Sequence, residues 1–266
     1  MATSQVTVKT LRQMKVDGEK IVSLTAYDAS FARVIDGQGV DVILVGDSLG
    51  MVMQGHDSTV PVTVDDIIYH SKSVAPQCKR AMVMADLPFM SYTSPKKAIA
   101  NAARLMQQGQ AHIVKLEGGE AQLDTVRHMT RHGVPVCAHL GLTPQTVHKL
   151  GGYRVQGRED AVAKQMLSDA LALQDAGADA VVLECVPVDL AEQLTAELEI
   201  PTIGIGAGRA CDGQVLVLQD MIGISSLAPK FSADFLVDGR NIPQAIAAYI
   251  KAVRDGSFPT DEQCFL

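Results

Sequence analysis

Acidic residues recur at the ends of short apolar runs in this sequence. Asp47 follows one such run after a single glycine, and Asp86 and Glu184 follow two others directly. Short, continuous apolar runs are typical of strands that are buried on both faces. An acid at the end of a buried strand is costly unless its charge is used. The recurrence therefore predicts that these residues serve a functional site.

Two further runs end in residues of complementary chemistry. One contains Lys115 and is followed by Glu117, and another ends in His139. Lys115 and Glu117 are two positions apart, so on a strand their side chains point to the same face. Any single one of these groups is equally well explained as a helix N-cap or a solvated loop residue. Four carboxylates at equivalent positions are better explained by a bound cation, because otherwise they would raise one another's pKa.

The expected cation is Mg2+. Donor sets made only of oxygen favour a hard ion, and we place Mg2+ before Ca2+ or Mn2+. Mg2+ usually takes one or two protein carboxylates and leaves positions for water and substrate oxygens. We therefore expect Asp47 and Asp86 to bind the metal and Glu117 to lie nearby, directly or through water. Lys115 would offset the excess negative charge and hold an anionic group, so the ligand is expected to be a small acid that chelates the metal.

Alternating strands and helices are needed to bring these residues together. The segments predicted as strands are residues 21–26, 42–45, 81–85, 112–116, 134–139, 180–183, 202–205 and 221–225. A weak repeat of glycine, turn and apolar run begins at Gly39, Gly109 and Gly177. Eight continuous apolar strands separated by helices predict an α/β fold, the parallel (β/α)8 TIM barrel, with a doubly wound open sheet as the alternative. In such a barrel the active site lies at the carboxyl ends of the strands.

Length and composition agree with this prediction. The chain has 266 residues, close to the ~250 typical of one barrel. We predict a single domain over residues 1–266, with a short amino-terminal segment at 1–20 and a tail at 258–266. A net charge of −7 without a basic run argues against nucleic acid as a partner. No apolar stretch approaches the ~20 residues of a membrane span, and we expect no signal peptide.

The five cysteines indicate a compartment. They lie far apart and form no CxxC pair, which is typical of reduced thiols in a cytoplasmic protein.

His128 and His132 have the spacing of a zinc pair but lack the glutamate of HExxH, so a solvated helix face is the better interpretation. The loop at residues 47–61 is long enough to be functional, and its Met51 and Met53 could line an adaptable pocket.

The sequence also resembles a known family, the ketopantoate (3-methyl-2-oxobutanoate) hydroxymethyltransferases. The resemblance extends from about residue 21 to residue 258, and its ordered motifs make it highly specific. The motifs are residues 25–28 (TAYD), 45–51 (VGDSLGM), 54–59 (QGHDST), 85–90 (ADLPFM), 115–119 (KLEGG), 139–145 (HLGLTPQ), 151–157 (GGYRVQG) and 204–208 (GIGAG).

The resemblance implies a fold and an activity. It implies a (β/α)8 barrel like that of the phosphoenolpyruvate mutase and isocitrate lyase group, a homo-oligomer, often a decamer, and use of Mg2+. It implies transfer of a hydroxymethyl group from 5,10-methylenetetrahydrofolate, the folate co-substrate, to the oxoacid 3-methyl-2-oxobutanoate. The product would be ketopantoate, a precursor of pantothenate and coenzyme A.

Site residues follow from the resemblance at the matching positions. Asp47, Asp86 and Glu117 would form the metal site. Asp47, Ser48, Asp86 and Lys115 would bind the oxoacid. These assignments agree with the metal site that was inferred from the strand ends.

The resemblance also implies roles for the two remaining groups. His139 would be a further substrate contact, and Glu184 would be the proton acceptor that forms a metal-stabilised enolate. The sequence departs from the family pattern in its amino-terminal segment and at residues 228–233, where relatives tend to be more basic. These departures concern contacts to the folate tail and leave the site residues unchanged.

Two other functions are compatible with the same residues. A Mg2+-dependent C–C lyase of the same superfamily would use the same metal site to stabilise an enolate. Such lyases commonly carry a reactive cysteine in a mobile loop, and the loop at residues 47–61 has none. A non-catalytic barrel that binds a metabolite is the second alternative. The presence of Glu184 together with the complete set of metal residues argues against it.

Overall fold

Eight parallel strands form a closed barrel in the computed structural model, which describes residues 4–225 and 228–266. The strands are β1 (Ile21–Thr25), β2 (Val42–Val45), β3 (Met82–Asp86), β4 (Ile113–Glu117), β5 (Val136–Gly141), β6 (Ala180–Glu184), β7 (Thr202–Ile205) and β8 (Gly213–Leu216). Each strand pairs with the next, and β1 pairs with β8. The predicted (β/α)8 barrel is therefore confirmed, and the open sheet is excluded.

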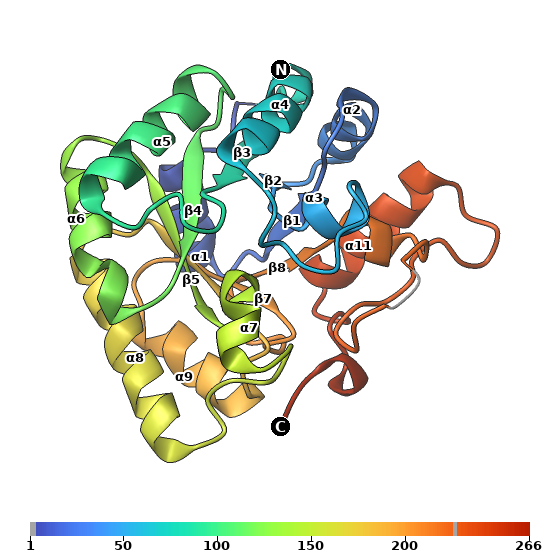
Figure 1. Cartoon of the computed structure of the whole chain (residues 1–266). Coiled ribbons are helices and arrows are strands. Elements are labelled where there is room, and N and C mark those ends of the chain that lie inside the picture. Colours follow the sequence, from blue (N-terminus) through green and yellow to red (C-terminus); the bar gives the residue numbers. More distant parts are fainter. Residues whose placement is uncertain (1–3, 226–227) are drawn as a thin grey trace.

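Helices surround the strands (Figure 1). The α-helices are α1 (Val8–Asp17), α2 (Ala29–Gln38), α3 (Leu49–Val52), α4 (Val64–Val74), α5 (Pro95–Gln107), α6 (Leu123–Arg131), α7 (Val147–Leu150), α8 (Asp160–Asp175), α9 (Val188–Glu197), α10 (Leu218–Met221) and α11 (Ile242–Arg254). The 3-10 helices are η1 (Ala75–Gln77), η2 (Glu120–Gln122), η3 (Pro144–Thr146) and η4 (Asp261–Gln263). Helices α2, α4, α5, α6, α8 and α9 contact one another in that order around the barrel, and α11 packs beside α2 against β1.

Local sequence explains where several helices begin and end. Thr63 and Asp66 form a capping box at the start of α4, each side chain accepting from the other residue's backbone N–H. Ser94 caps α5 directly before a proline at the first helical position. Gly39 ends α2 in the left-handed conformation, with φ of 93°. These caps satisfy backbone groups that a helix end otherwise leaves unpaired.

Alternation along the strands separates two apolar cores. The side chains that pack inside the barrel include Val42, Leu44, Met82, Met84, Ile113, Cys137, Val182, Ile203 and Val215. The intervening residues, such as Ile43, Val83 and Leu116, pack outward against the helices. Because side chains alternate with a period of two, Asp86 continues the inward row of Met82 and Met84. The apolar interior thus ends in charged residues at the carboxyl ends of the strands.

The eighth strand was predicted in the wrong place. Residues 221–225 are the end of α10 and the turn after it, and β8 is Gly213–Leu216 instead. β8 begins with a glycine because a Cβ there would lie 2.5 Å from the carbonyl oxygen of Ile21 on the neighbouring strand. Glycine and glutamine interrupt the apolar pattern of β8, whereas the run around Met221 is apolar because it packs a short helix onto the core. The other seven predicted strands agree with the observed ones to within two residues.

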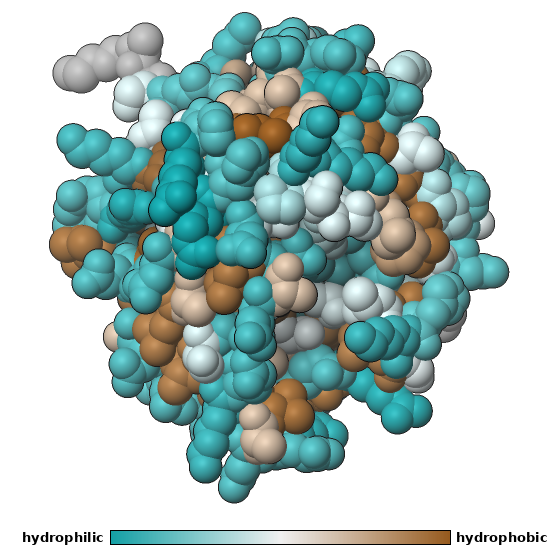
Figure 2. Space-filling view, turned by 60° about the vertical axis from the view of Figure 1, so that its left-hand side comes forward, coloured by the Kyte–Doolittle hydropathy of each residue, from teal (hydrophilic) through white to brown (hydrophobic). Residues whose placement is uncertain are grey.

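Three further observations concern the length of the helices, the surface and the cysteines. No helix among the described residues is long and apolar enough to cross a membrane. On the face shown in Figure 2, hydrophobic residues occur in small groups among hydrophilic ones. All five cysteines are buried and form no disulfide, as expected from their spacing.

Candidate active site

The predicted site residues meet at the carboxyl end of the barrel. Asp86 and Lys115 are register partners on β3 and β4, and Glu117 and His139 are register partners on β4 and β5. All four are buried, with exposures of 2 to 4%. Strand alternation aims them at the barrel axis, because the intervening Leu116 faces the helices. The structure therefore brings together groups that lie up to about fifty residues apart in the sequence.

An ion pair and a hydrogen bond to the backbone join the ends of β2, β3 and β4. Lys115 Nζ lies 2.8 Å from Asp86 Oδ1. The other oxygen of Asp86, Oδ2, accepts a hydrogen bond of 3.0 Å from the backbone N–H of Asp47. Asp86 thus fixes the turn that carries Asp47 and orients the lysine. Burial disfavours the charged form of Lys115, but Asp86, Glu117 and Asp47 raise its pKa above the ordinary value, so the lysine is a permanent cation.

His139 lies between two carboxyl groups. Its Nδ1 is 3.7 Å from Oε1 of Glu117, and its Nε2 is 3.3 Å from Oε2 of Glu184. Neither ring nitrogen makes a hydrogen bond to another described residue. The side chain of Glu184 is 13% exposed, whereas those of Glu117 and Asp86 are 2% exposed. Glu184 is therefore the carboxyl group of this cluster that a ligand entering from solvent can reach most easily.

Ser48 occupies the start of α3, which lies inside the loop that the sequence predicted without a helix. Its Oγ is 2.8 Å from the hydroxyl oxygen of Tyr27, which follows β1. Burial, and to a smaller extent the charges of Asp86 and Asp47, raise the pKa of Tyr27, so its phenol stays protonated. Tyr27 stood in a motif of the resemblance but received no role, and the structure places it beside the site.

Gln145 in η3 is a site residue that the sequence analysis missed. Its backbone N–H donates to Oε2 of Glu117 at 3.1 Å, and its side-chain Nε2 donates to Oδ2 of Asp47 at 2.8 Å. It is buried, with 2% of its surface exposed. Its partners lie 28 and 98 positions away in the sequence. No local pattern predicts such contacts, because they arise only when the barrel closes.

The electrostatics of the cluster are unfavourable without a further cation. Burial and the neighbouring charge of Asp86 raise the pKa of Asp47 to about 7. Burial and the charge of Asp47 raise the pKa of Glu117 well above its usual range. Oε1 of Glu117 is buried and makes no hydrogen bond to any described residue. Lys115 alone does not neutralise these acids, so the site suits an added positive charge.

The donor set fits Mg2+. Asp47 and Asp86 are neighbours at the carboxyl ends of the strands, and Gln145 links Asp47 to Glu117. No three side chains of His, Cys, Asp or Glu converge as an all-protein metal cage within residues 4–225 and 228–266. Mg2+ does not need such a cage, since it commonly uses one or two carboxylates and fills its other positions with water and substrate. The arrangement therefore agrees with a metal that binds together with a chelating ligand.

Exposed apolar side chains lie on connecting segments at the carboxyl end of the barrel. They are carried by the segments after β2, β3 and β5 and comprise Met51, Met53, Phe89, Met90 and Tyr153. The hydroxyl of Tyr153 contacts Sδ of Met51 at 3.5 Å, which links two of these segments. Burial and the charges of Glu184, Asp47 and Glu117 raise the pKa of Tyr153. The hydroxyl of Tyr153 therefore lies close enough for the charges of these acids to affect its ionisation.

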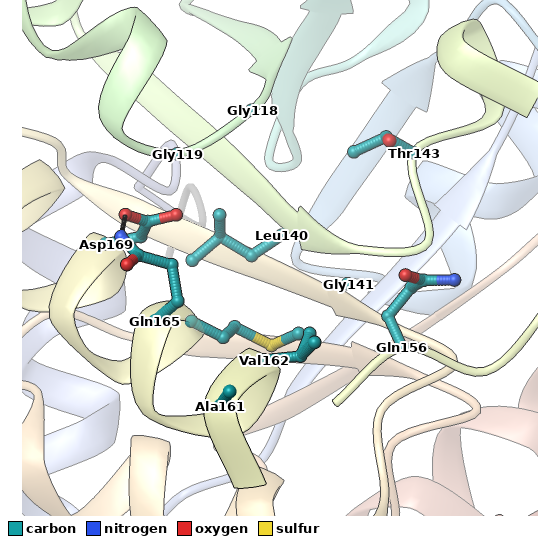
Figure 3. A pocket seen from close by; sticks show the side chains of 11 residues that line it. Gly118, Gly119, Leu140, Gly141, Thr143, Gln156, Ala161, Val162, Gln165 and Asp169 are labelled. Atoms are coloured by element: carbon teal, nitrogen blue, oxygen red, sulfur yellow. Dashed lines mark hydrogen bonds between the residues drawn. The ribbon is translucent and has the colours of Figure 1, made fainter. Parts of the chain in front are cut away.

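A separate cavity of about 410 Å3 lies beside the site, between the ends of β4 and β5 and helix α8. Figure 3 shows Leu140 projecting into it toward Gln165 and Asp169, which are hydrogen-bonded to each other at 2.8 Å. Leu140 follows His139 on the same strand, so the two side chains point to opposite faces. The cavity is thus outside the barrel wall, and the carboxylate cluster is inside it.

Comparison with known proteins identifies the family. The family model described as ketopantoate hydroxymethyltransferase matches residues 5–261. The chain belongs to this family. A 3-methyl-2-oxobutanoate hydroxymethyltransferase from Thiobacillus denitrificans is 57% identical over 98% of this chain and 99% of that protein. One from Idiomarina loihiensis is 54% identical over the full length of both chains. This member of the ketopantoate hydroxymethyltransferase family is thus an enzyme of the hydroxymethyltransferase kind.

Solved structures support the fold of this family member. Phosphoenolpyruvate phosphomutase from Streptomyces platensis subsp. rosaceus aligns with a TM-score of 0.62 over 88% of each chain, at 16% identity. A 2,3-dimethylmalate lyase, described as a PEP mutase/isocitrate lyase superfamily member, aligns with a TM-score of 0.58 over 81% of this chain and 79% of its own, at 16% identity. The predicted likeness to that superfamily is confirmed for the fold.

Proposed function

We propose that this enzyme transfers a hydroxymethyl group from 5,10-methylenetetrahydrofolate to 3-methyl-2-oxobutanoate and so forms ketopantoate for pantothenate synthesis. The observation that carries the proposal is the buried cluster of Asp47, Asp86 and Lys115 at the carboxyl end of the barrel. Its mixture of acids and one lysine suits a small anionic oxoacid that binds together with a metal. The names of the relatives point to the same oxoacid.

The oxoacid would bind on one side of the cluster. Lys115 supplies a fixed positive charge for its carboxylate, and Asp86 keeps the lysine in place through the ion pair. Ser48 supplies a hydroxyl group whose orientation is set by Tyr27. His139 would be a further contact, because neither of its ring nitrogens makes a hydrogen bond to any residue that the structure describes.

Asp47 and Asp86 would hold Mg2+, with Glu117 near it or joined to it through water. Bound there, Mg2+ would act as a Lewis acid that favours negative charge on the keto oxygen of the oxoacid. The raised pKa of Asp47 and of Glu117 in the metal-free protein supports this proposal, because a bound cation would favour their charged forms.

Glu184 would accept the C3 proton of the oxoacid and so leave an enolate. Its side chain is 13% exposed, compared with 2% for those of Glu117 and Asp86, and Nε2 of His139 lies 3.3 Å from its Oε2. A proton acceptor must lie within reach of the proton it takes, and a carboxylate at the rim satisfies this requirement once the oxoacid is bound. The enolate carbon would then attack the methylene carbon of the donor, and water would supply the hydroxyl group as the donor amine is released.

The donor would approach across the exposed apolar side chains at the carboxyl end of the barrel. Tyr153 and Met51 offer a partly exposed aromatic ring and thioether next to the acids. Such side chains suit the flat ring system of a folate, since aromatic and thioether groups pack well on aromatic faces. The charged interior would bind the oxoacid, and these apolar side chains would bind the one-carbon donor.

We further propose that the single barrel domain of residues 1–266 acts in the cytoplasm as a homo-oligomer, a decamer by resemblance to the family. The five buried, unpaired cysteines support a reducing compartment. Sedimentation at micromolar concentration tests the assembly. A species of only 28.3 kDa would contradict it.

The activity assay that tests the function combines both substrates with and without Mg2+. Ketopantoate should form only when the oxoacid, the folate donor and the metal are all present. Cleavage of an added 2-hydroxy acid or oxoacid without folate would favour the C–C lyase. Binding without turnover of any substrate would favour the non-catalytic barrel.

A further inference from the structure

We propose that Gln145 is a positioning residue that orients Asp47 and Glu117 and thereby sets the affinity of the site for its divalent cation. This inference rests on the proposed function, because the orientation of the two acids affects metal affinity only if they hold the metal. It assigns a role to a residue that stood in a motif of the resemblance, residues 139–145, but received no role there.

The backbone of Gln145 contacts one of the two acids. Its N–H donates to Oε2 of Glu117 at 3.1 Å. The residue lies in η3, between β5 and α7, so the segment after β5 reaches back over the end of β4. Glu117 then has one oxygen engaged by Gln145, whereas its other oxygen, Oε1, is buried without a hydrogen bond to any described residue.

The side chain of Gln145 contacts the second acid. Nε2 donates to Oδ2 of Asp47 at 2.8 Å and to the carbonyl oxygen of Leu87 at 3.0 Å. Both partners are acceptors, so both amide protons are used and the amide has only one satisfactory orientation. Oε1 accepts a hydrogen bond of 2.5 Å from the hydroxyl of Tyr92. The amide is therefore held from both ends.

These contacts engage one carboxyl oxygen of each acid and leave the other oxygen free of described hydrogen bonds. Gln145 engages one oxygen of Asp47 and one oxygen of Glu117, and no described hydrogen bond uses Oδ1 of Asp47 or Oε1 of Glu117. A neutral donor can fix a carboxylate without adding the positive charge that would compete with a cation. One glutamine thus sets the direction of two acids that come from β2 and β4.

A purely structural role would place the contacts of Gln145 differently. Gln174 in α8 provides the comparison: its Oε1 accepts from the backbone N–H groups of Glu199 and Ile200, which lie in the loop before β7. That loop is at the amino end of the strands, away from the acids. Gln145 instead donates to Oε2 of Glu117 and to Oδ2 of Asp47, two carboxyl groups at the carboxyl ends of the strands. Its position suits the control of a ligand site.

The test measures Mn2+ binding, as a paramagnetic probe for Mg2+, by electron paramagnetic resonance in the full-length protein. Gln145→Met keeps the volume of the side chain and removes both side-chain amide donors, so the contact to Asp47 is lost while the backbone N–H still donates to Glu117. We expect its Kd for Mn2+ to rise about 10-fold or more, as is usual when a partner that orients metal ligands is lost. Gln174→Met is the matched control and should bind Mn2+ with the affinity of the wild type.

Tyr92→Phe provides a milder second variant, because it removes one hydroxyl that donates to Oε1 of Gln145 and to neither carboxyl group. It should raise the Kd for Mn2+ by a smaller factor, and in the double variant Tyr92→Phe, Gln145→Met it should add nothing to the effect of Gln145→Met. Unchanged Mn2+ affinity in both single variants would overturn the role of Gln145. If the wild type itself binds no Mn2+, the proposed function fails together with this inference.

Discussion

Lys115 and Asp86 are direct neighbours on adjacent strands, and their side chains form an ion pair of 2.8 Å with exposures of only 5% and 2%. The pair closes the top of the apolar barrel interior and at the same time presents a cation to the ligand site. A buried pair of this kind adds little net stability, because desolvation offsets much of the attraction. Loss of one partner alone should still be costly, because it leaves the other charge buried and unpaired.

The first prediction concerns this pair. Lys115→Met should lower the free energy of unfolding by about 3 kcal/mol, because Asp86 is left as an uncompensated buried acid. The double variant Lys115→Met, Asp86→Asn should be more stable than the single one, although both should be inactive. Urea unfolding of the four proteins in the cycle measures this coupling. Additive losses would contradict the importance of the pair.

Removal of single acids should separate the roles of Asp47 and Asp86. Asp47→Ala should lower activity by about two orders of magnitude or more and leave stability nearly unchanged, since it removes repulsion with Asp86. Asp86→Ala should lose activity and stability together, because it breaks the ion pair with Lys115. Glu117→Gln should lose less activity if its contact to the metal runs through water. Full activity of Asp47→Ala with added Mg2+ would refute the metal site.

The stability of the metal-free enzyme should decrease as pH rises. The folded-state pKa of Asp47, about 7, is above its ordinary value of 3.8, so the folded protein holds a proton that the unfolded chain has released. Stability is then lost as pH rises through this interval. At pH 8 the variant Asp47→Asn should be more stable than the wild type by about 4 kcal/mol, and near pH 4 the difference should nearly vanish. Thermal unfolding in the presence of a chelator measures it, and a difference that is the same at both pH values would count against the shift.

The exposed apolar side chains at the carboxyl end should affect the binding of the folate donor and not that of the oxoacid. Tyr153→Ala should raise KM for 5,10-methylenetetrahydrofolate about 10-fold and leave KM for the oxoacid within about twofold, since loss of one aromatic contact costs about 1 kcal/mol or more. Tyr69→Ala is the control, because Tyr69 is a tyrosine 70% exposed on the outer helix α4. Equal effects on both KM values would place Tyr153 at the oxoacid instead.

The sequence predicted the barrel and the acids because both leave local patterns. Continuous apolar runs mark strands buried on both faces, and Asp86, Glu117 and Glu184 directly end such runs. β8 was misplaced because Gly213 is selected by close approach to Ile21, which is a tertiary requirement.

Gln145 was missed for the same physical reason. Its partners Asp47 and Glu117 come from other strands, and only closure of the barrel brings them to it. Tyr27 likewise follows β1 and meets Ser48 after β2. Polar networks between strands leave no period in a sequence, whereas buried faces do.

Exchange of the C3 proton of 3-methyl-2-oxobutanoate in heavy water tests the central claim most directly, because it separates enolate formation from one-carbon transfer. With enzyme and Mg2+ the proton should exchange, in the absence of folate or with a non-reactive folate present. A chelator and Asp47→Ala should each stop the exchange. Glu184→Gln should still bind the oxoacid and lose exchange, since an amide cannot accept the proton. Exchange by Glu184→Gln at the wild-type rate would transfer the role of base to His139, and no exchange by the wild type under either condition would contradict the enolate mechanism.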